Sequence, residues 1–340
     1  MNKLMIVVPA YNEEEALPKT LTVLDGILTD LIDKQKIDSK SRIVIVNDGS
    51  ADKTWEIIEN TAKSNPHITG VNFSRNFGHQ NALVAGLTAA RDYGDIFITI
   101  DADLQDDVNA IYEMVDENAK GFDVVYGARN SRETDSAFKR GTADMFYGLM
   151  GKLGVEMVPN AADYRLMSQR AVDHLLSFKE HNLFLRGVVP RVGFPSTVVY
   201  YARKEREEGT SKYPLTKMIT FAWDGITSFS VAPMRFILVA GILSLLVSVG
   251  MVIYALYQQI SGQTVEGWTS LMVSLWLIGG FQMIGLAIIG EYIGKIFNEV
   301  KSRPRFIIQD NLLSDQDFDD KQVNTQPISH SEAHKHDELN

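Results

Sequence analysis

The chain has 340 residues, 45% of them hydrophobic, so it is long enough for two modules and can bury a sizeable core. Its net charge is −10, of which residues 310–340 contribute −6, and this acidic balance argues against a nucleic-acid binder. The chain has no cysteine, which excludes disulfides and thiolate metal sites.

The first part of the chain alternates short apolar runs with helical stretches. We expect buried strands at residues 4–8, 43–46, 96–100 and 124–126, and helices at residues 14–31, 53–64, 80–93 and 107–118. This alternation predicts an α/β fold with a mainly parallel sheet. Ligands of such sheets bind beyond the carboxyl ends of the strands, which here carry polar clusters. Neither a dinucleotide-binding glycine motif nor a P-loop follows the strands, which disfavours nucleotide-dependent redox and ATPase chemistry.

Three aspartates follow two of the expected strands. Asp101 and Asp103 come directly after residues 96–100, and if the chain stays extended there, both carboxylates face one hard divalent cation that would hold a diphosphate. Aspartates also form turns after strands, so this pair alone is compatible with both interpretations. Asp48 follows residues 43–46, where its carboxylate could accept hydrogen bonds from a base or a ribose, although most Asp-Gly pairs are simple turns.

Two uncharged stretches, residues 236–257 and 268–290, are each long enough to cross a bilayer as a helix. Lys and Arg gather before the first stretch and after the second, and the connection between them has neither, so we expect both termini in the cytoplasm. Residues 213–232 have apolar positions at helical spacing. They predict an interfacial helix on the membrane or an ordinary amphipathic helix packed on the domain.

These patterns divide the chain into five segments. In order they are a cytoplasmic domain at 1–212, the interfacial helix at 213–232, a two-span transmembrane hairpin at 233–295, a basic juxtamembrane segment at 296–309 and a disordered acidic tail at 310–340.

Several motifs resemble one enzyme family. Residues 6–14 (IVVPAYNEE), 46–50 (VNDGS) and 101–105 (DADLQ) resemble the inverting family 2 glycosyltransferases of GT-A fold. Residues 74–78, 127–129, 162–166, 184–187 and 209–213, with the two-helix anchor, are similar to its polyprenyl-phosphate branch, which includes bactoprenol glucosyltransferases and dolichyl-phosphate mannose synthases. The similarity spans residues 4–306, and residues 1–212 would then be a GT-A (nucleotide-diphospho-sugar transferase) catalytic domain.

The resemblance implies transfer of a hexose, glucose or N-acetylglucosamine, from a UDP-sugar to undecaprenyl phosphate at the cytoplasmic face of the cell membrane, with inversion. It also implies Mg²⁺ or Mn²⁺ as cofactor, contact with membrane lipid, and a homo-oligomer. A flippase and a downstream glycosyltransferase would use the product in cell-envelope glycosylation. Two alternatives remain open, a processive membrane polysaccharide synthase and a catalytically silent membrane adaptor for a flippase.

The resemblance also assigns roles at the matching positions. The nucleotide-sugar would be bound by Pro9, Tyr11, Glu13, Asp48, Arg75 and Asp101, and the metal by Asp101, Asp103 and Gln105. The acceptor phosphate would be bound by Arg129, Arg140, Arg206, Ser211 and Lys212, and catalysis would involve Asp103, Arg129 and Asp163. Asp163 would orient the acceptor or the sugar, act as a base, or serve as a structural partner of Arg165.

Overall fold

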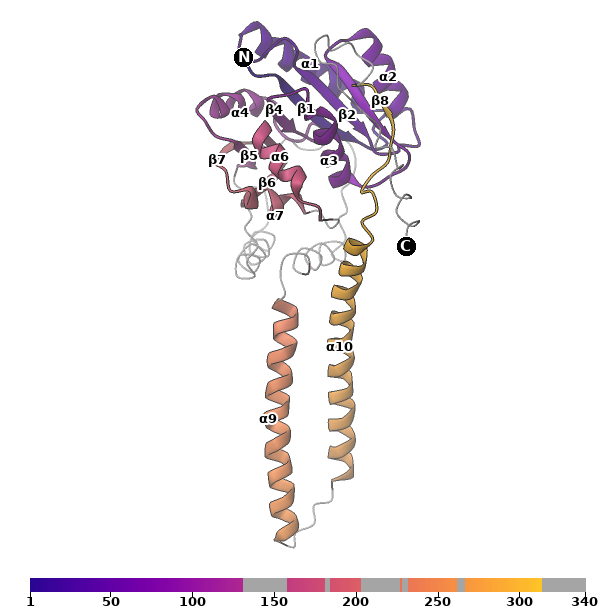
Figure 1. Cartoon of the computed structure of the whole chain (residues 1–340), viewed down its shortest axis with the longest axis vertical. Coiled ribbons are helices and arrows are strands. Elements are labelled where there is room, and N and C mark those ends of the chain that lie inside the picture. The colour runs from indigo at the N-terminus through magenta and orange to yellow at the C-terminus, as the bar shows by residue number, and fades with distance from the viewer. Residues whose placement is uncertain (131–157, 181–183, 203–226, 228–231, 262–266, 314–340) are drawn as a thin grey trace, which may run out of the picture.

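The computed structural model describes residues 1–130, 158–180, 184–202, 227, 232–261 and 267–313 (Figure 1). These residues form an α/β domain followed by two long helices. The strands are β1 (Leu4–Ala10), β2 (Arg42–Asn47), β3 (Ile68–Phe73), β4 (Ile96–Thr99), β5 (Val124–Arg129), β6 (Ala161–Ser168), β7 (Ser196–Tyr201) and β8 (Ile308–Asn311). They form one sheet in the order β7-β5-β6-β4-β1-β2-β3-β8.

The sheet is mixed and mainly parallel, as the sequence predicts. β1 lies at its centre and pairs in parallel with β2 and β4, β2 continues in parallel to β3, and β5 pairs in parallel with β7. β6 runs antiparallel between β4 and β5, and β8 runs antiparallel beside β3. Because β6 runs the other way, its first residues lie at the edge of the sheet where β1, β2 and β4 end.

Helices cover both faces of the sheet. They are α1 (Leu17–Asp33), α2 (Thr54–Ser64), α3 (His79–Ala90), α4 (Ala110–Ala119), α6 (Gln169–Ser177) and α7 (Leu185–Val188), with a 3₁₀ turn η1 (Val189–Val192). Alternate residues of β1 pack into two separate cores, Leu4, Ile6 and Val8 with α1 and α4, and Met5 and Val7 with α3. A strand buried on both faces explains the continuous apolar runs in the sequence.

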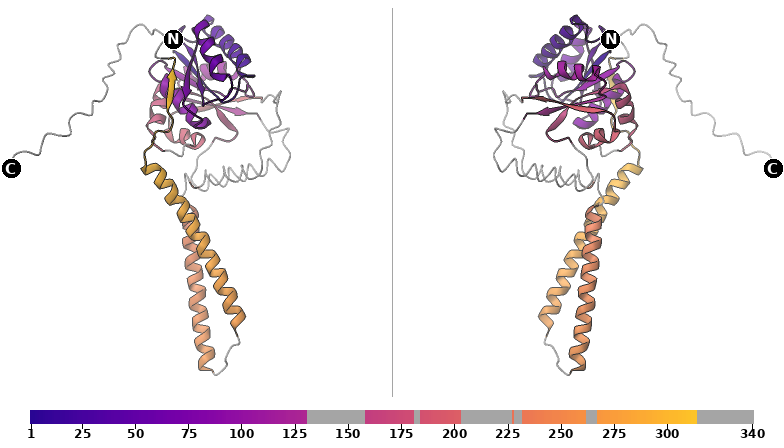
Figure 2. Two further views of the ribbon diagram at one scale, coloured as in Figure 1. Left: turned by 90° about the vertical axis from the view of Figure 1, so that its right-hand side faces the viewer. Right: turned by 90° about the vertical axis from the view of Figure 1, so that its left-hand side faces the viewer.

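Two long helices follow the domain, α9 (Ala232–Ile260) and α10 (Trp268–Val300). They project away from the sheet side by side (Figures 1 and 2). Both are long and apolar enough to cross a membrane, with candidate spans at Pro233–Met251 and Leu277–Val300. At 29 and 33 residues, they would extend roughly 43 and 50 Å, which exceeds a hydrocarbon core of about 30 Å. The predicted interfacial helix falls almost entirely outside the described residues.

The chain returns to the sheet after α10, and here the predicted start of the disordered tail is wrong. The tail from Asp310 was expected to be disordered, yet Asp310 lies in β8 opposite Asn72 of β3. Phe306 stacks on Phe73 with ring centroids 5.4 Å apart, and Leu313 is buried in the core. The backbone of β8 forms hydrogen bonds with the otherwise open edge of β3, and the apolar side chains of Phe306 and Leu313 hold it there. The polar local sequence of β8 does not reveal these contacts. Residues 314–340 lie outside the described residues.

Candidate active site

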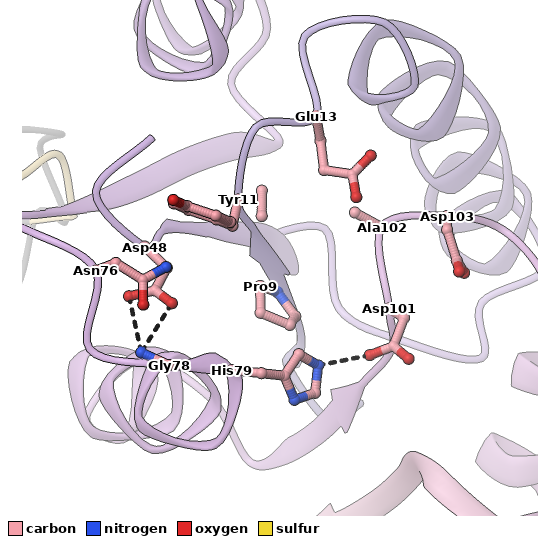
Figure 3. Close-up of a pocket in the computed structure, with 11 residues that line it drawn as sticks. Pro9, Tyr11, Glu13, Asp48, Asn76, Gly78, His79, Asp101, Ala102 and Asp103 are labelled. Atoms are coloured by element: carbon pink, nitrogen blue, oxygen red, sulfur yellow. Dashed lines mark hydrogen bonds and ion pairs between the residues drawn. The ribbon is translucent and has the colours of Figure 1, made fainter. Parts of the chain in front are cut away.

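A pocket of about 290 Å³ opens at the carboxyl ends of β1, β2 and β4 (Figure 3). This is the edge of an α/β sheet where ligands are expected. Pro9 and His79 lie in the middle of the pocket, between Asp48 on one side and Asp101 on the other. The lining residues are Pro9, Ala10, Tyr11, Glu13, Asp48, Asn76, Gly78, His79, Asp101, Ala102 and Asp103. The structure therefore brings together six of the residues that the sequence predicts for this site: Pro9, Tyr11, Glu13, Asp48, Asp101 and Asp103.

Asp48 lies directly after β2 and is 3% exposed. Its carboxylate accepts hydrogen bonds from the backbone N–H groups of Phe77 (2.7 Å) and Gly78 (2.9 Å). Burial raises the pKa of Asp48 above its ordinary value, although these two N–H groups oppose the shift. A carboxylate has about four acceptor positions, so Asp48 can still accept a hydrogen bond from a ligand in the pocket.

Gly49 makes the approach between Asp48 and the next loop possible. Its φ is +65°, and a Cβ at this position would lie 2.2 Å from the backbone carbon of Arg75. Only glycine combines this backbone conformation with so close an approach. The Asp-Gly pair is therefore a turn, and the same turn holds Asp48 at the pocket.

Asp101 and Asp103 lie in a turn and not on an extended strand. The hydrogen bonding of β4 to β1 ends at Ile100, whose N–H donates to the carbonyl oxygen of Val7 (3.1 Å). The turn is closed by the N–H of Gln105, which donates to the Asp103 carboxylate (3.2 Å). Alternation along a strand therefore does not place the two carboxylates on one face, and that prediction is wrong. Both nevertheless line the pocket because the turn bends around its edge.

His79 is a pocket residue that the sequence reasoning missed. It is the first residue of α3, and its Nε2 lies 2.8 Å from Asp101 Oδ1. Burial by itself would lower the pKa of His79, but the hydrogen bond and the charge of Asp101, together with the charge of Asp163, raise it above the ordinary value. The only signal in the sequence was that His79 directly follows the family-like segment at residues 74–78. A lone histidine after such a motif indicates no role until its neighbour across the pocket is known.

Asp163 lies beside the pocket between two arginines. The side chain of Arg165 is 3% exposed, and its Nη2 lies 2.6 Å from Asp163 Oδ1, while Arg186 Nη2 lies 3.3 Å from Asp163 Oδ2. Burial would raise the pKa of Asp163, but the two guanidinium groups and His79 hold it below its ordinary value. Asp163 is therefore an ionised carboxylate at neutral pH. Its backbone is held beside the end of β4, because Thr99 Oγ1 donates to the Asp163 carbonyl oxygen (2.6 Å).

Arg129 is the last residue of β5 and pairs with a buried aspartate. Its Nη2 lies 3.2 Å from Asp106 Oδ1, and the Asp106 side chain is only 3% exposed, whereas that of Arg129 is 34% exposed. Asp106 accepts from both Nε and Nη2 of the guanidinium, Tyr201 is a further side-chain partner, and about a third of the Arg129 side chain is exposed. This geometry leaves N–H donors available for an anion.

The remaining predicted residues divide into two groups. Arg75 and Gln105 are described but do not line the pocket: the Arg75 guanidinium lies 4.0 Å from the centre of the Phe77 ring, and Gln105 is buried. Arg140, Arg206, Ser211 and Lys212 lie outside the described residues. Within the described part of the chain, no cluster of three or more His, Asp or Glu side chains could hold a metal ion by itself.

Comparison with known proteins identifies close relatives. A model described as Glycosyl transferase family 2 matches residues 5–176. The chain is 48% identical over 313 residues to the uncharacterized glycosyltransferase YkoT of Bacillus subtilis (strain 168), covering 92% of this chain and 93% of that protein. It is 40% identical to the SfII prophage-derived bactoprenol glucosyl transferase of Shigella flexneri, covering 90% and 97%. A solved structure of glucosyl-3-phosphoglycerate synthase from Mycobacterium tuberculosis matches with a TM-score of 0.43 and 18% identity, covering 66% and 76%.

Proposed function

Since the chain belongs to glycosyl transferase family 2 and is a glycosyltransferase, we propose that it transfers one hexose from a UDP-sugar to undecaprenyl phosphate. The observation that carries the proposal is the pocket that joins Asp48, Asp101 and Asp103 at the sheet edge of a chain with two membrane-length helices. A relative named bactoprenol glucosyl transferase supports a polyprenyl phosphate acceptor and favours glucose over N-acetylglucosamine. Two apolar helices suit an acceptor whose hydrocarbon chain stays in the bilayer.

The two sides of the pocket would bind different parts of the donor. Asp48 and Tyr11 lie on the side suited to the uridine, where the Asp48 carboxylate would accept hydrogen bonds from N–H or hydroxyl groups. His79, whose Nε2 lies 2.8 Å from Asp101 Oδ1, lies on the diphosphate side with Asp101 and Asp103. Arg75 would contact the donor only after a movement of its side chain away from Phe77.

The donor atoms at Asp101 and Asp103 fit a divalent cation shared with the donor diphosphate. Carboxylate oxygens are the ligands that Mg²⁺ and Mn²⁺ prefer, and Mg²⁺ is commonly held by one or two carboxylates together with substrate phosphates. Asp101 and Asp103 match that arrangement, since the described residues hold no cluster of three or more such side chains. Asp101 and Asp103 would hold the ion, with Gln105 beside them. When bound, it supplies positive charge that stabilises the departing diphosphate.

The acceptor phosphate would react as the nucleophile. With a second pKa near 6, a phosphate monoester is largely ionised at neutral pH, so little help from a base is needed. One of its oxygens forms a bond to the anomeric carbon as the bond from that carbon to UDP breaks. Displacement in line inverts the centre and gives a β-linked product from an α-linked donor. Arg129 would hold the acceptor phosphate, and Asp163, kept ionised by Arg165 and Arg186, would orient the reacting groups.

Membranes that contain the chain, incubated with undecaprenyl phosphate and each labelled UDP-sugar in turn, test this function. We expect a lipid product that carries a single hexose. A polymer would identify a processive synthase instead, and the absence of any labelled lipid with every UDP-sugar would contradict the proposal and favour a silent adaptor.

Arg129→Ala is expected to raise the KM for undecaprenyl phosphate about tenfold, because a guanidinium contact to a phosphate is a strong charge-assisted hydrogen bond. The KM for the UDP-sugar should stay within about twofold, since Arg129 does not line the donor pocket. Arg91→Ala, which removes an exposed arginine paired with Asp173, is the matched control. An unchanged KM for the lipid would show that Arg129 does not bind the acceptor.

We also propose that both termini are cytoplasmic, which follows from the Lys and Arg residues that flank the two spans. Because the chain has no cysteine, single cysteines can report the topology. On intact cells, a membrane-impermeant maleimide should label Ser261→Cys, at the end of the first long helix, and leave Ser39→Cys in the catalytic domain unlabelled. Labelling of Ser39→Cys alone would reverse the orientation. With this orientation, a flippase and a downstream glycosyltransferase would use the product, and a homo-oligomer remains part of the proposal.

A further inference from the structure

A series of polar side chains connects the strand after the second membrane-length helix to the edge of the pocket. Asp310 of β8 lies opposite Asn72 of β3. The Asn72 amide donates from Nδ2 to Asp310 Oδ2 (2.8 Å), and the Asn47 amide donates from Nδ2 to Asn72 Oδ1 (2.7 Å). Asn72 and Asn47 are 7% and 2% exposed, so water cannot easily replace these partners.

The series continues into the two loops that border the pocket. Ser50 Oγ donates to Asn47 Oδ1 (2.5 Å) and accepts a hydrogen bond from the backbone N–H of Asn12 (2.9 Å). Asn12 lies between Tyr11 and Glu13, which both line the pocket. Its φ is 53°, a left-handed conformation that a residue other than glycine keeps only when its surroundings hold it. The hydrogen bond that the Asn12 N–H donates to Ser50 Oγ is one such contact.

The direction of each hydrogen bond follows from the group at the outer end. A carboxylate accepts hydrogen bonds and donates none, so Asn72 must turn its Nδ2 toward Asp310 and its Oδ1 toward Asn47. Asn47 then presents Nδ2 to Asn72 and Oδ1 to Ser50. The Ser50 hydroxyl therefore donates its hydrogen bond to Asn47, and its oxygen accepts one from the N–H of Asn12. An acceptor at position 310 thus selects the arrangement that holds the loop at residues 11–13.

We propose that Asp310, Asn72, Asn47 and Ser50 are positioning residues that hold the loop at residues 11–13 in its donor-binding conformation. This inference rests on the donor pocket proposed above. It adds β8, the strand that follows the membrane-length helices, to the parts of the chain that support that pocket. Asp310 reaches Asn72 only because β8 pairs with β3. The return of the chain to the sheet therefore serves donor binding as well as the stability of the sheet edge.

Equilibrium binding of UDP to the full-length protein in detergent, with Mg²⁺ present, tests the inference. We expect Asp310→Ala to weaken UDP binding about fivefold to tenfold, the effect of losing a partly buried hydrogen bond to a charged group. The KM for the UDP-sugar should rise by the same factor, while the KM for undecaprenyl phosphate should not change. Asp310→Asn retains an acceptor oxygen and should bind UDP within about twofold of the unaltered chain. Gln309→Ala, at an exposed neighbour in the same strand, is the matched control.

A second variant tests whether the residues act as one network. Ser50→Ala removes the link to Asn12 and should also weaken UDP binding. Because both changes interrupt one series, the Asp310→Ala/Ser50→Ala double variant should lose less affinity than the product of the two single losses. Multiplicative losses would overturn the inference, as would equal UDP affinity for Asp310→Ala and the unaltered chain.

Two further results separate this inference from its premises. If Asp310→Ala lowers the unfolding temperature and raises the KM of both substrates alike, its role is structural only and the inference is overturned. If the unaltered chain does not bind UDP at all, the proposed donor pocket fails, and the inference fails with it.

Discussion

Asp103→Asn is expected to lower the rate of hexose transfer at least a hundredfold while the protein stays folded. Asparagine keeps the size of the side chain and an oxygen that can accept the N–H of Gln105, so the turn after β4 should persist. The variant loses a negative charge that would bind the cation at the diphosphate, and stabilisation of a leaving group is commonly worth a factor of about 10² to 10³ in rate. Transfer in purified membranes at saturating UDP-sugar measures the effect.

Asp92→Asn is the matched control for this prediction, because it removes the same charge from an exposed residue just before β4. It should transfer hexose at the rate of the unaltered chain. Retention of full transfer by Asp103→Asn, or by the unaltered chain in excess EDTA, would contradict the proposed role of Asp103 at a divalent cation.

The second large effect is expected at Asp163. Asp163→Leu leaves Arg165, which is almost fully buried, without its carboxylate partner. Removing one member of a buried ion pair commonly costs about 3 to 5 kcal/mol of stability, because the other charge stays buried and uncompensated. We therefore expect a large drop in the free energy of unfolding together with loss of transfer. Chemical denaturation followed by circular dichroism measures the first of these effects.

The double variant Asp163→Leu/Arg165→Met separates structure from catalysis. Replacing both members of a buried pair by apolar residues of similar size is often close to neutral, so stability should recover. We expect transfer to remain at least about a hundredfold below that of the unaltered chain, because the carboxylate that orients the reacting groups is absent. Recovery of transfer along with stability would show that Asp163 is only a structural partner of Arg165.

The same pair makes a distinct contribution to the dependence of stability on pH. The folded state lowers the pKa of Asp163 below its unfolded value, so its ionised form stabilises the fold above the unfolded pKa. This stabilisation is lost as the pH falls through the folded pKa. In the double variant, the part of the acid unfolding that Asp163 causes should therefore be absent.

The sequence predicts the strands that are continuously apolar and misses those whose apolar pattern is interrupted by polar residues. β1, β2, β4 and β5 appear as continuous apolar runs because every side chain in them meets a core. β3 and β6 are just as well embedded, yet they contain Asn72, Asp163 and Arg165, whose polarity interrupts the apolar pattern. β8 is short and mostly polar, so its local sequence resembles the acidic segment that follows it.

The residues of the candidate site likewise divide into those that a local sequence pattern predicts and those that it does not. Asp48, Asp101 and Asp103 were found because they come directly after recognisable strands, at the sheet edge where ligands bind. His79 was missed because its partner Asp101 is 22 residues away, and Asp310 was missed because its partner Asn72 is 238 residues away. Neither pair leaves a periodic or local pattern in the chain.

The sequence by itself determined the α/β class, the polar clusters at the strand ends and the two membrane-length helices, because each depends on the order of residues within one short segment. Only the tertiary structure decided that Asp101 pairs with His79, that Asp163 lies between Arg165 and Arg186, and that the segment after the helices completes the sheet. These features depend on which strands lie side by side. That choice is made by the packing of the whole domain and is not encoded in any one segment.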